Sequence, residues 1–412
     1  MKTTTILGAA AVLVVILGAC DTVIGIPDRK VAQHFECNDQ KCTCTEGYGD
    51  CDGDPSDGCE VDVRTSDDHC GACGNHCNNG TCNMGVCQCH LGFVDCDGDP
   101  QNGCEAELAT DGRNCGACGH DCLGGACAGS RCQAFELQTF SYPQSISLQG
   151  GLLYVAVCSA PQDSPLLRMS VDGGMPAALA TNVDCGVYQS TSNGVIYWTN
   201  SDAIYASPIV QPSIPMNVVT AAKAKTLRDL ATSDDQLYWS IRDDMAMTGS
   251  LHRMPLAGGT ATVISNKPAS GLITDAKNAY WTDATGIHSV PHDGTAITTI
   301  TGVEKPVSLA VSETTLYVVD TGDTAPGILA VPLAGGTPVM FADGAATFAL
   351  KIDGGKLYWL DYLDGNIYAQ PLAGGPKEVL SAGQGYATNA DLAFDEKAIY
   401  FLADQAIYKV AR

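Results

Sequence analysis

Residues 270–291 read SGLITDAKNAYWTDATGIHSVP, and the plan of the larger part of the chain is visible in them. An apolar segment comes first, a polar turn follows at Asp275–Asn278, and a segment built on Tyr280-Trp281 precedes an Ile-containing segment that starts at Gly286. Apolar and polar residues alternate with a period of two, which is typical of antiparallel strands joined by short turns. Because no window of helical period stands out, the stretch predicts a small antiparallel sheet.

The same plan recurs along residues 134–412. A Tyr followed by an aromatic or β-branched residue stands at Tyr154, Tyr197, Tyr238, Tyr280, Tyr317, Tyr358 and Tyr400, in steps of 43, 41, 42, 37, 41 and 42 residues. Gly-Gly pairs such as Gly258-Gly259 mark the turn before the last strand of a unit, since glycine tolerates the positive φ of tight hairpins. Units of about 40–50 residues are typical of propeller blades. The sequence therefore predicts an all-β fold with a seven-bladed β-propeller.

The last unit indicates how the ring closes. It ends at Arg412 after a third strand, Ala406–Val410, so a fourth strand is missing. A spare segment, residues 134–140 (AFELQTF), precedes the first unit. We expect this segment to supply the outer strand of the last blade, which pins the two ends of the propeller together and leaves only short, protected sheet edges.

The aromatic motif resembles that of the YWTD propellers, most closely in Tyr280-Trp-Thr-Asp283 and Tyr197-Trp-Thr-Asn200. The resemblance covers nearly all of 134–412 and implies a structural role, in which the aromatic residue packs between blades and the Asp bonds neighbouring backbone. The best-known members have six blades, whereas this chain has seven units. Their ligand-binding residues have no recognisable counterparts here, so the resemblance implies a fold and no ligand.

The cysteines define a separate region. Of 21 Cys, one is Cys20, eighteen lie between Cys37 and Cys132, and Cys158 and Cys185 stand alone. From Cys44 to Cys87 the gaps are 7, 8, 11, 3, 4, 5 and 5, and the same gaps recur from Cys89 to Cys132. Residues 37–133 therefore contain a tandem repeat of 45 residues.

Disulfides are the expected stabiliser of this region, because it has few large apolar residues. Each bridge contributes about 2–4 kcal/mol, and nine bridges would use all eighteen Cys in a connectivity that spacing does not reveal. The alternative is a zinc or iron–sulfur site at Cys70, Cys73 and Cys77 and at the copy of this motif, but thiolate sites suit reducing compartments. The segment resembles Cys-rich repeats of Gram-negative envelope proteins, a family with no assigned chemistry to transfer.

An acidic turn occurs once in each repeat and is a calcium candidate. Carboxylates alternating with Gly can aim several oxygens at one centre, and Ca²⁺ takes about 6–8 oxygen ligands. The turns resemble the start of EF-hand and thrombospondin-type calcium loops, but Pro55 and Pro100 replace the EF-hand Gly and the Glu comes one residue early. The alternative is a solvated acidic turn. The candidate ligands are Asp50, Asp52, Asp54, Asp57 and Glu60, and Asp95, Asp97, Asp99, Asn102 and Glu105.

The amino terminus predicts export and anchoring. Its apolar run, Ile6–Leu17, follows one Lys, is too short for a comfortable membrane span and has the form of a signal peptide. The run ends in Leu17-Gly-Ala-Cys20, which resembles the bacterial lipobox. This resemblance implies removal of residues 1–19, acyl chains on Cys20 that partner a membrane, and an anchor and linker over 20–36. An ordinary secretion signal is the alternative. The outer membrane or cell surface is the favoured location, with the inner membrane as the alternative.

The charge excludes one class of partner. The chain has 46 acidic and 22 basic side chains and a net charge of -24, which opposes nucleic-acid binding.

Loops after the second and fourth strands of each blade emerge on one face, and polar residues gather there. Cys158 and Cys185 both belong to this face and are predicted to form a disulfide. Ordinary turn chemistry is the alternative explanation of the Asp residues. The candidate binding residues are Asp202, Asp243, Asp283, Asp320, Asp361 and Arg228.

Catalysis finds little support, because no metalloprotease, serine-hydrolase, P-loop or dinucleotide motif occurs and no catalytic residue is predicted. The sequence predicts an anchored envelope protein whose propeller binds a protein or glycan without catalysis. An extracytoplasmic hydrolase or lyase acting in the propeller channel, and a calcium-stiffened structural spacer, are the alternatives.

Overall fold

The computed structural model describes residues 34–38, 41–54, 58–99, 101–158, 164–181, 183, 185, 188–200, 203–209, 215–220, 226–243, 246–324, 326–343, 347, 349–382, 391–403 and 405–412. The predicted leader, Cys20, Asp57 and Asp202 lie outside these residues. The chain forms two compact units. The first comprises residues 1–121 and 127–130, and the second residues 122–126 and 131–412.

The first unit consists of short hairpins and turns held by disulfides. Its strands are β1 (Phe35–Asn38), β2 (Lys41–Cys44), β3 (Tyr48–Gly49), β4 (Val61–Asp62), β5 (Gly80–Asn83), β6 (Val86–Cys89), β7 (Phe93–Val94), β8 (Ala106–Glu107) and β9 (Cys127–Ala128). The pairs are β1–β2, β3–β4, β5–β6 and β7–β8. The buried cluster of this unit consists of cysteines, Cys70, Cys77 and Cys82, rather than of large apolar side chains.

The disulfide connectivity repeats with the sequence. The first copy has Cys44–Cys59, Cys51–Cys73, Cys70–Cys82 and Cys77–Cys87. The second has Cys89–Cys104, Cys96–Cys118, Cys115–Cys127 and Cys122–Cys132, each 45 residues further on. Because these sulfurs are bonded to one another, the zinc or iron–sulfur alternative at Cys70, Cys73 and Cys77 is wrong. Cys37 and Cys42 are register partners in β1 and β2.

Within the first unit, two Asn side chains join one repeat to the next. Asn78 donates from Nδ2 to the Asn102 carbonyl at 2.8 Å, and Asn79 donates from Nδ2 to the Cys104 carbonyl at 2.9 Å. The backbone N–H of Cys104 donates to the Asn78 carbonyl at 2.9 Å. The repeats therefore stack through polar contacts to backbone.

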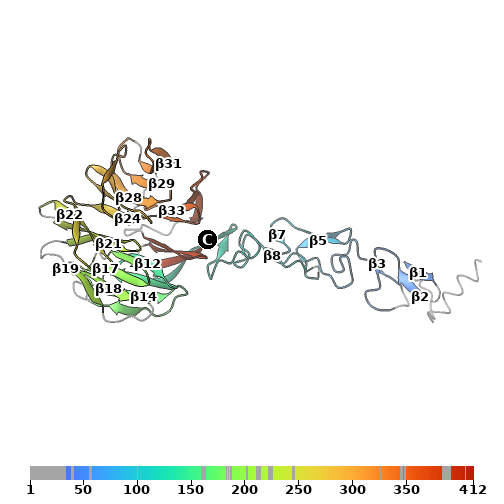
Figure 1. The fold of residues 1–412 in the computed structure, drawn as a ribbon. Coiled ribbons are helices and arrows are strands. Elements are labelled where there is room, and N and C mark those ends of the chain that lie inside the picture. The colour runs from blue at the N-terminus through green and yellow to red at the C-terminus, as the bar shows by residue number, and fades with distance from the viewer. Residues whose placement is uncertain are drawn as a thin grey trace, which may run out of the picture. The chain divides into compact units, whose positions relative to one another are not determined.

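The second unit begins with β10 (Arg131–Cys132) and then forms seven four-stranded antiparallel sheets, the blades seen in Figure 1. Blade 1 is β12 (Pro143–Gln149), β13 (Leu152–Val157), β14 (Leu166–Ser170) and β15 (Ala177–Ala180). Blade 2 is β16 (Gln189–Ser192), β17 (Val195–Asn200), β18 (Ala203–Pro208) and β19 (Met216–Thr220). Blade 3 is β20 (Thr226–Thr232), β21 (Gln236–Asp243), β22 (Thr248–Pro255) and β23 (Thr262–Ser265). Blade 4 is β24 (Ser270–Thr274), β25 (Asn278–Asp283), β26 (Gly286–Pro291) and β27 (Thr298–Ile300).

Blade 5 is β28 (Pro306–Val311), β29 (Thr315–Asp320), β30 (Gly327–Pro332) and β31 (Val339–Asp343). Blade 6 is β32 (Leu350–Asp353), β33 (Lys356–Leu360), β34 (Ile367–Pro371) and β35 (Glu378–Ser381). Blade 7 is β36 (Leu392–Phe394), β37 (Ala398–Ala403), β38 (Ala406–Ala411) and β11 (Phe135–Thr139). The prediction of an all-β, seven-bladed propeller preceded by a disulfide-rich region is confirmed. No helix among the described residues is long and apolar enough to cross a membrane.

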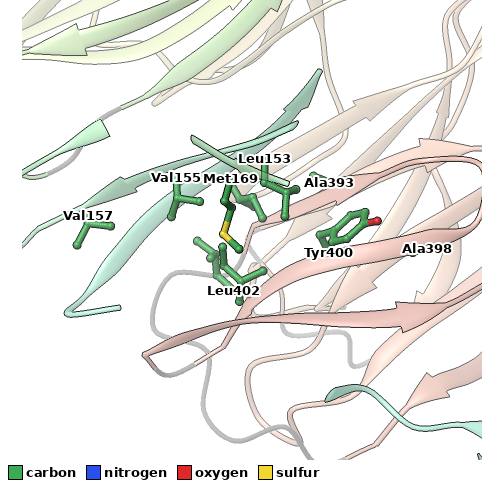
Figure 2. Packing of buried hydrophobic residues seen from close by; sticks show 10 residues of the cluster. Leu153, Val155, Val157, Met169, Ala393, Ala398, Tyr400 and Leu402 are labelled. Atoms are coloured by element: carbon green, nitrogen blue, oxygen red, sulfur yellow. The ribbon is translucent and has the colours of Figure 1, made fainter. Parts of the chain in front are cut away.

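The strand borrowed from before the first blade completes the last one. Phe135 pairs with Lys409 and Thr139 with Ala406 in an antiparallel register. Blades 7 and 1 then bury a common cluster that includes Leu153, Val155 and Tyr400, which are labelled among its side chains in Figure 2. The seam that closes the ring is therefore a continuous piece of core.

The motif aromatics lie in the interfaces between blades. Trp198, Trp239, Trp281 and Trp359 are each 1% exposed. In four blades the second-strand Trp stacks on an aromatic ring of the third strand, as in Trp281 on His288 with centroids 5.4 Å apart. These buried aromatic side chains contribute to the stability of this unit together with the aliphatic residues around them.

Candidate functional site

The innermost strands of the blades carry a belt of polar side chains that hydrogen-bond from blade to blade. Between blades 1 and 2, Gln189 donates to Ser145 Oγ at 2.7 Å and accepts from Ser147 Oγ at 2.9 Å. Between blades 2 and 3, the hydroxyls of Ser190 and Thr232 lie 2.7 Å apart. These contacts set the wall of the channel and use most of its polar groups.

Two carboxylates extend the belt. Asp229 of β20 accepts from the backbone N–H of Leu272, in the next blade, at 2.8 Å. Asp391 stands just before β36 and accepts from the N–H of Ile146 at 3.0 Å across the closing seam. Each also accepts from the residue that follows it. Both therefore bond one blade to its neighbour.

Burial raises the pKa of Asp229 to about 6, while the N–H groups of Leu272 and Leu230 and the charge of Lys351 oppose the rise. Burial likewise raises the pKa of Asp391, and Lys351 again opposes it. Lys351 of β32 is thus the cation that acts electrostatically on both carboxylates.

A cavity of ≈310 Å³ opens beside this belt. Its wall comes from the inner strands of blades 6, 7, 1 and 2 and combines hydroxyl, amide, charged and apolar groups. The lining residues are Ile146, Ser147, Leu148, Gln189, Ser190, Thr191, Lys351, Asp391, Leu392, Ala393 and Phe394. This cavity is the candidate binding site, because convergent polar groups in a concavity at the centre of a closed ring are typical of ligand sites.

The predicted face residues lie mostly in turns that they stabilise. The Asp283 side chain is 2% exposed, lies 2.9 Å from His288 Nε2 and accepts from the Thr285 N–H at 2.7 Å. Asp320 is buried and accepts from the N–H groups of Glu304, Lys305 and Gly322. Asp361 is buried and accepts from the Leu363 N–H at 2.9 Å. These three carboxylates therefore do not face solvent as free binding groups.

The other two described face residues are more accessible. Asp243, at the end of β21, accepts from the Ala246 N–H at 2.9 Å. Arg228 lies on β20 beside Asp229 and interacts with Tyr188, whose pKa burial raises. Cys158 and Cys185 form a disulfide.

The three propeller histidines lie away from the innermost strands. His252 is on β22 and stacks on Trp239, and His288 is on β26. His292 follows β26 and lies 2.8 Å from the Tyr238 hydroxyl. In the described part of the chain, the carboxylates of the channel therefore have no histidine partner on their own strands.

The acidic turns of the first unit form the same cluster twice. One oxygen each of Asp50, Asp52 and Glu60 lie within 4.8 Å of one another, and so do those of Asp95, Asp97 and Glu105. In the second copy Asn102 donates to Asp97 at 3.0 Å, while its own buried Oδ1 accepts no hydrogen bond in the described residues. Asp54 and Asp99 are not members of these two clusters.

Comparison with known proteins gives fold neighbours only. No family model and no curated protein matches the chain. Similar solved structures include an oligogalacturonate lyase in complex with manganese, with 11% identity, 68% of this chain and 90% of that chain covered, and a TM-score of 0.50. The extracellular domain of BT4673 from B. thetaiotaomicron matches with 12% identity, 67% of this chain and 39% of that chain covered, and a TM-score of 0.50.

A nidogen/laminin complex structure matches with 18% identity, 56% of this chain and 96% of that chain covered, and a TM-score of 0.41. At these identities the likeness shows the propeller fold alone. The nine disulfides of the described residues require an oxidising compartment. The chain is therefore an extracytoplasmic β-propeller protein with a disulfide-rich repeat unit.

The channel residues Asp229, Asp391 and Lys351 are not among the predicted site residues. Asp229 and Asp391 both begin an Asp-Leu-Ala triplet, 162 residues apart, the first within β20 and the second just before β36. This repeated triplet is the signal in the sequence that points to them. Lys351 has no such motif. Its position becomes visible only when the strand register is known.

Proposed function

We propose that the protein is a lipid-anchored envelope protein whose propeller binds a protein or glycan partner without catalysis. The polar cavity in the channel of the closed ring carries the proposal. The wall carboxylates are bonded to backbone N–H groups, an arrangement that suits a rigid recognition surface better than general acid–base chemistry.

The binding function can be tested with the full chain carrying Cys20→Ser, which removes the predicted acyl site. Labelled protein is added to envelope fractions that are untreated, protease-treated or periodate-treated. We expect saturable retention that unlabelled protein competes away and that one of the two treatments abolishes. Retention that does not saturate would contradict the proposal.

The anchor has its own test. Metabolic labelling with an alkynyl fatty acid should mark the wild-type chain and leave Cys20→Ala unlabelled, and only the wild type should partition with membranes. Labelling of Cys20→Ala would mean that another residue carries the acyl chain. An unlabelled wild type would contradict the lipid anchor and favour an ordinary secretion signal.

The acidic turns support a second function, calcium binding by the repeats. Three carboxylates that converge with no basic partner among the described residues repel one another unless a cation lies between them. The buried, unpaired Oδ1 of Asn102 is a further oxygen at the second cluster. Ca²⁺ binding would stiffen the turns and make the first unit a rigid spacer.

The duplication supplies an internal control for the calcium proposal. Calorimetry of the full chain should give two sites, and Asp97→Asn should remove one while Asp52→Asn removes the other. Asp68→Asn, at a carboxylate that is 83% exposed, should leave both. Absence of binding heat together with an unchanged melting temperature would reject calcium binding.

A further inference from the structure

Lys351 departs from the pattern of the blades. In each blade one inner-strand residue is the register partner of the motif Tyr, and in blade 6 this residue is Lys351, opposite Tyr358. The equivalent residues are Ser147, Ser190, Ala231, Ile273, Ala310 and Ala393. A long cation where the other blades have uncharged side chains breaks the local rule of the fold, and such breaks concentrate at functional sites.

The wall around Lys351 has used most of its own hydrogen-bonding capacity. Gln189 is held by Ser145 and Ser147, Ser190 bonds Thr232, and Asp391 bonds two backbone N–H groups. Lys351 is exposed to the cavity and has no hydrogen bond or ion pair with any described residue. Its ammonium therefore offers up to three donors to a ligand.

The charges around Lys351 favour a neutral hydrogen-bond acceptor in the ligand over an anionic one. Lys351 is balanced by two carboxylates, Asp229 and Asp391, so the inner belt has no excess of positive charge. A phosphate or other multiply charged anion would meet both carboxylates at low local dielectric. A neutral hydroxyl group accepts from Lys351 and also donates to the remaining lone pairs of the carboxylates and wall hydroxyls.

The volume of the cavity and the apolar part of its wall suit a sugar residue as the ligand. Leu148 and Phe394, both partly exposed, supply apolar surface beside the polar groups, as the C–H face of a sugar ring requires. A volume of ≈310 Å³ lies at the lower end of the ~300–1,000 Å³ of small-molecule sites, so it suits one terminal residue rather than an extended chain. We propose that the channel cavity binds a single neutral sugar residue, the end of a glycan, with Lys351 as its hydrogen-bond donor. This inference rests on the proposed binding function.

The test uses the full chain and defined probes. Methyl glycosides of glucose, galactose and N-acetylglucosamine, with glucose 6-phosphate as the charged comparison and tetraalanine as the peptide comparison, are added before acetylation with an activated ester. Peptide mass spectrometry follows the acetylation rate of each Lys. A neutral glycoside should slow the reaction of Lys351 and leave that of Lys356, whose partner is Glu378, unchanged.

The affinity of variants for the protecting glycoside then tests whether Lys351 is the hydrogen-bond donor. By saturation-transfer NMR, Lys351→Met should weaken binding of the protecting glycoside by about tenfold or more, the cost of losing a charged hydrogen bond, while Lys356→Met binds as the wild type. Protection by glucose 6-phosphate or tetraalanine alone, or by no probe, would overturn the sugar assignment. In that case saturable retention on envelope fractions would still support the proposed function, and its loss would remove both.

Discussion

The two units of this chain solve the same stability problem by different means. In the first, four disulfides of the first repeat and three of the second hold hairpins of two to four residues per strand, and the buried cluster is made of cysteine. In the second, two disulfides, Cys122–Cys132 and Cys158–Cys185, accompany a ring of 28 strands whose interfaces bury aromatic and aliphatic side chains. The difference shows that a composition poor in large apolar residues is compensated covalently, because too little area can be buried.

The two repeats differ in one instructive place. Asn78 and Asn79 of the first copy bond the backbone of the second copy, and the equivalent residues of the second copy are Leu123 and Gly124. Leu123 belongs to the second unit and packs against the core cluster of blades 7 and 1. The last repeat is thus adapted to end the array, as terminal repeats are.

Reduction of the disulfides should produce the largest difference in behaviour between the two units. With a phosphine reductant, the repeat unit should lose its amide protection against hydrogen exchange, since each bridge contributes about 2–4 kcal/mol there. The propeller should keep the protection of its inner strands, because Cys158–Cys185 lies in loops and Cys122–Cys132 precedes the blades. Hydrogen exchange read by mass spectrometry reports both units in one sample. An equal loss of amide protection in both units would contradict the conclusion that only the repeat unit depends on its disulfides.

The second prediction uses matched leucines. Leu153 is fully buried in the seam cluster, whereas Leu91 of the first unit is fully exposed at 104%. Leu153→Ala should lower the free energy of unfolding of the propeller by about 2–5 kcal/mol. Leu91→Ala should change stability by less than about 0.5 kcal/mol. Urea unfolding measures both, and a large cost at Leu91 would reveal a core in the repeat unit.

Much of this contrast is predictable from sequence, because its causes are periodic. The Tyr spacing defines the number of blades, the unmatched strand at 134–140 indicates the closure, and the 45-residue cysteine period separates the units. What depends on register is harder to predict. Asp283, Asp320 and Asp361 look like surface acids in the sequence, yet each carboxylate is buried and accepts backbone N–H groups of its own loop or a neighbouring one. Lys351 is one Lys among others until strand pairing places it opposite Tyr358.

The third prediction concerns pH. Because burial raises the pKa of Asp229 to about 6 from the ordinary value of 3.8, the folded chain holds this proton more tightly than the unfolded chain between about pH 4 and 6. The contribution of Asp229 to stability therefore falls as pH rises through this range. Asp229→Asn cannot titrate, so its stability relative to wild type should rise by about 1–3 kcal/mol between pH 4 and 7. Parallel profiles for the two proteins would contradict the shift.

The smallest effect comes from two tyrosines at equivalent positions. Tyr400 donates to Asp395 Oδ2 at 2.8 Å, whereas the buried hydroxyl of Tyr154 has no partner among the described residues. Asp395 stands five residues before Tyr400, and the residue five before Tyr154 is Gln149, which is not a carboxylate. Tyr400→Phe should cost about 1–2 kcal/mol, because it leaves a partly buried carboxylate with one bond fewer.

Tyr154→Phe removes only an unpaired polar atom and should be neutral or slightly stabilising. Thermal unfolding of the two variants shows which one is less stable. The comparison is matched, because both substitutions remove only a tyrosine hydroxyl. A destabilised Tyr154→Phe would mean that its hydroxyl has an acceptor outside the described residues.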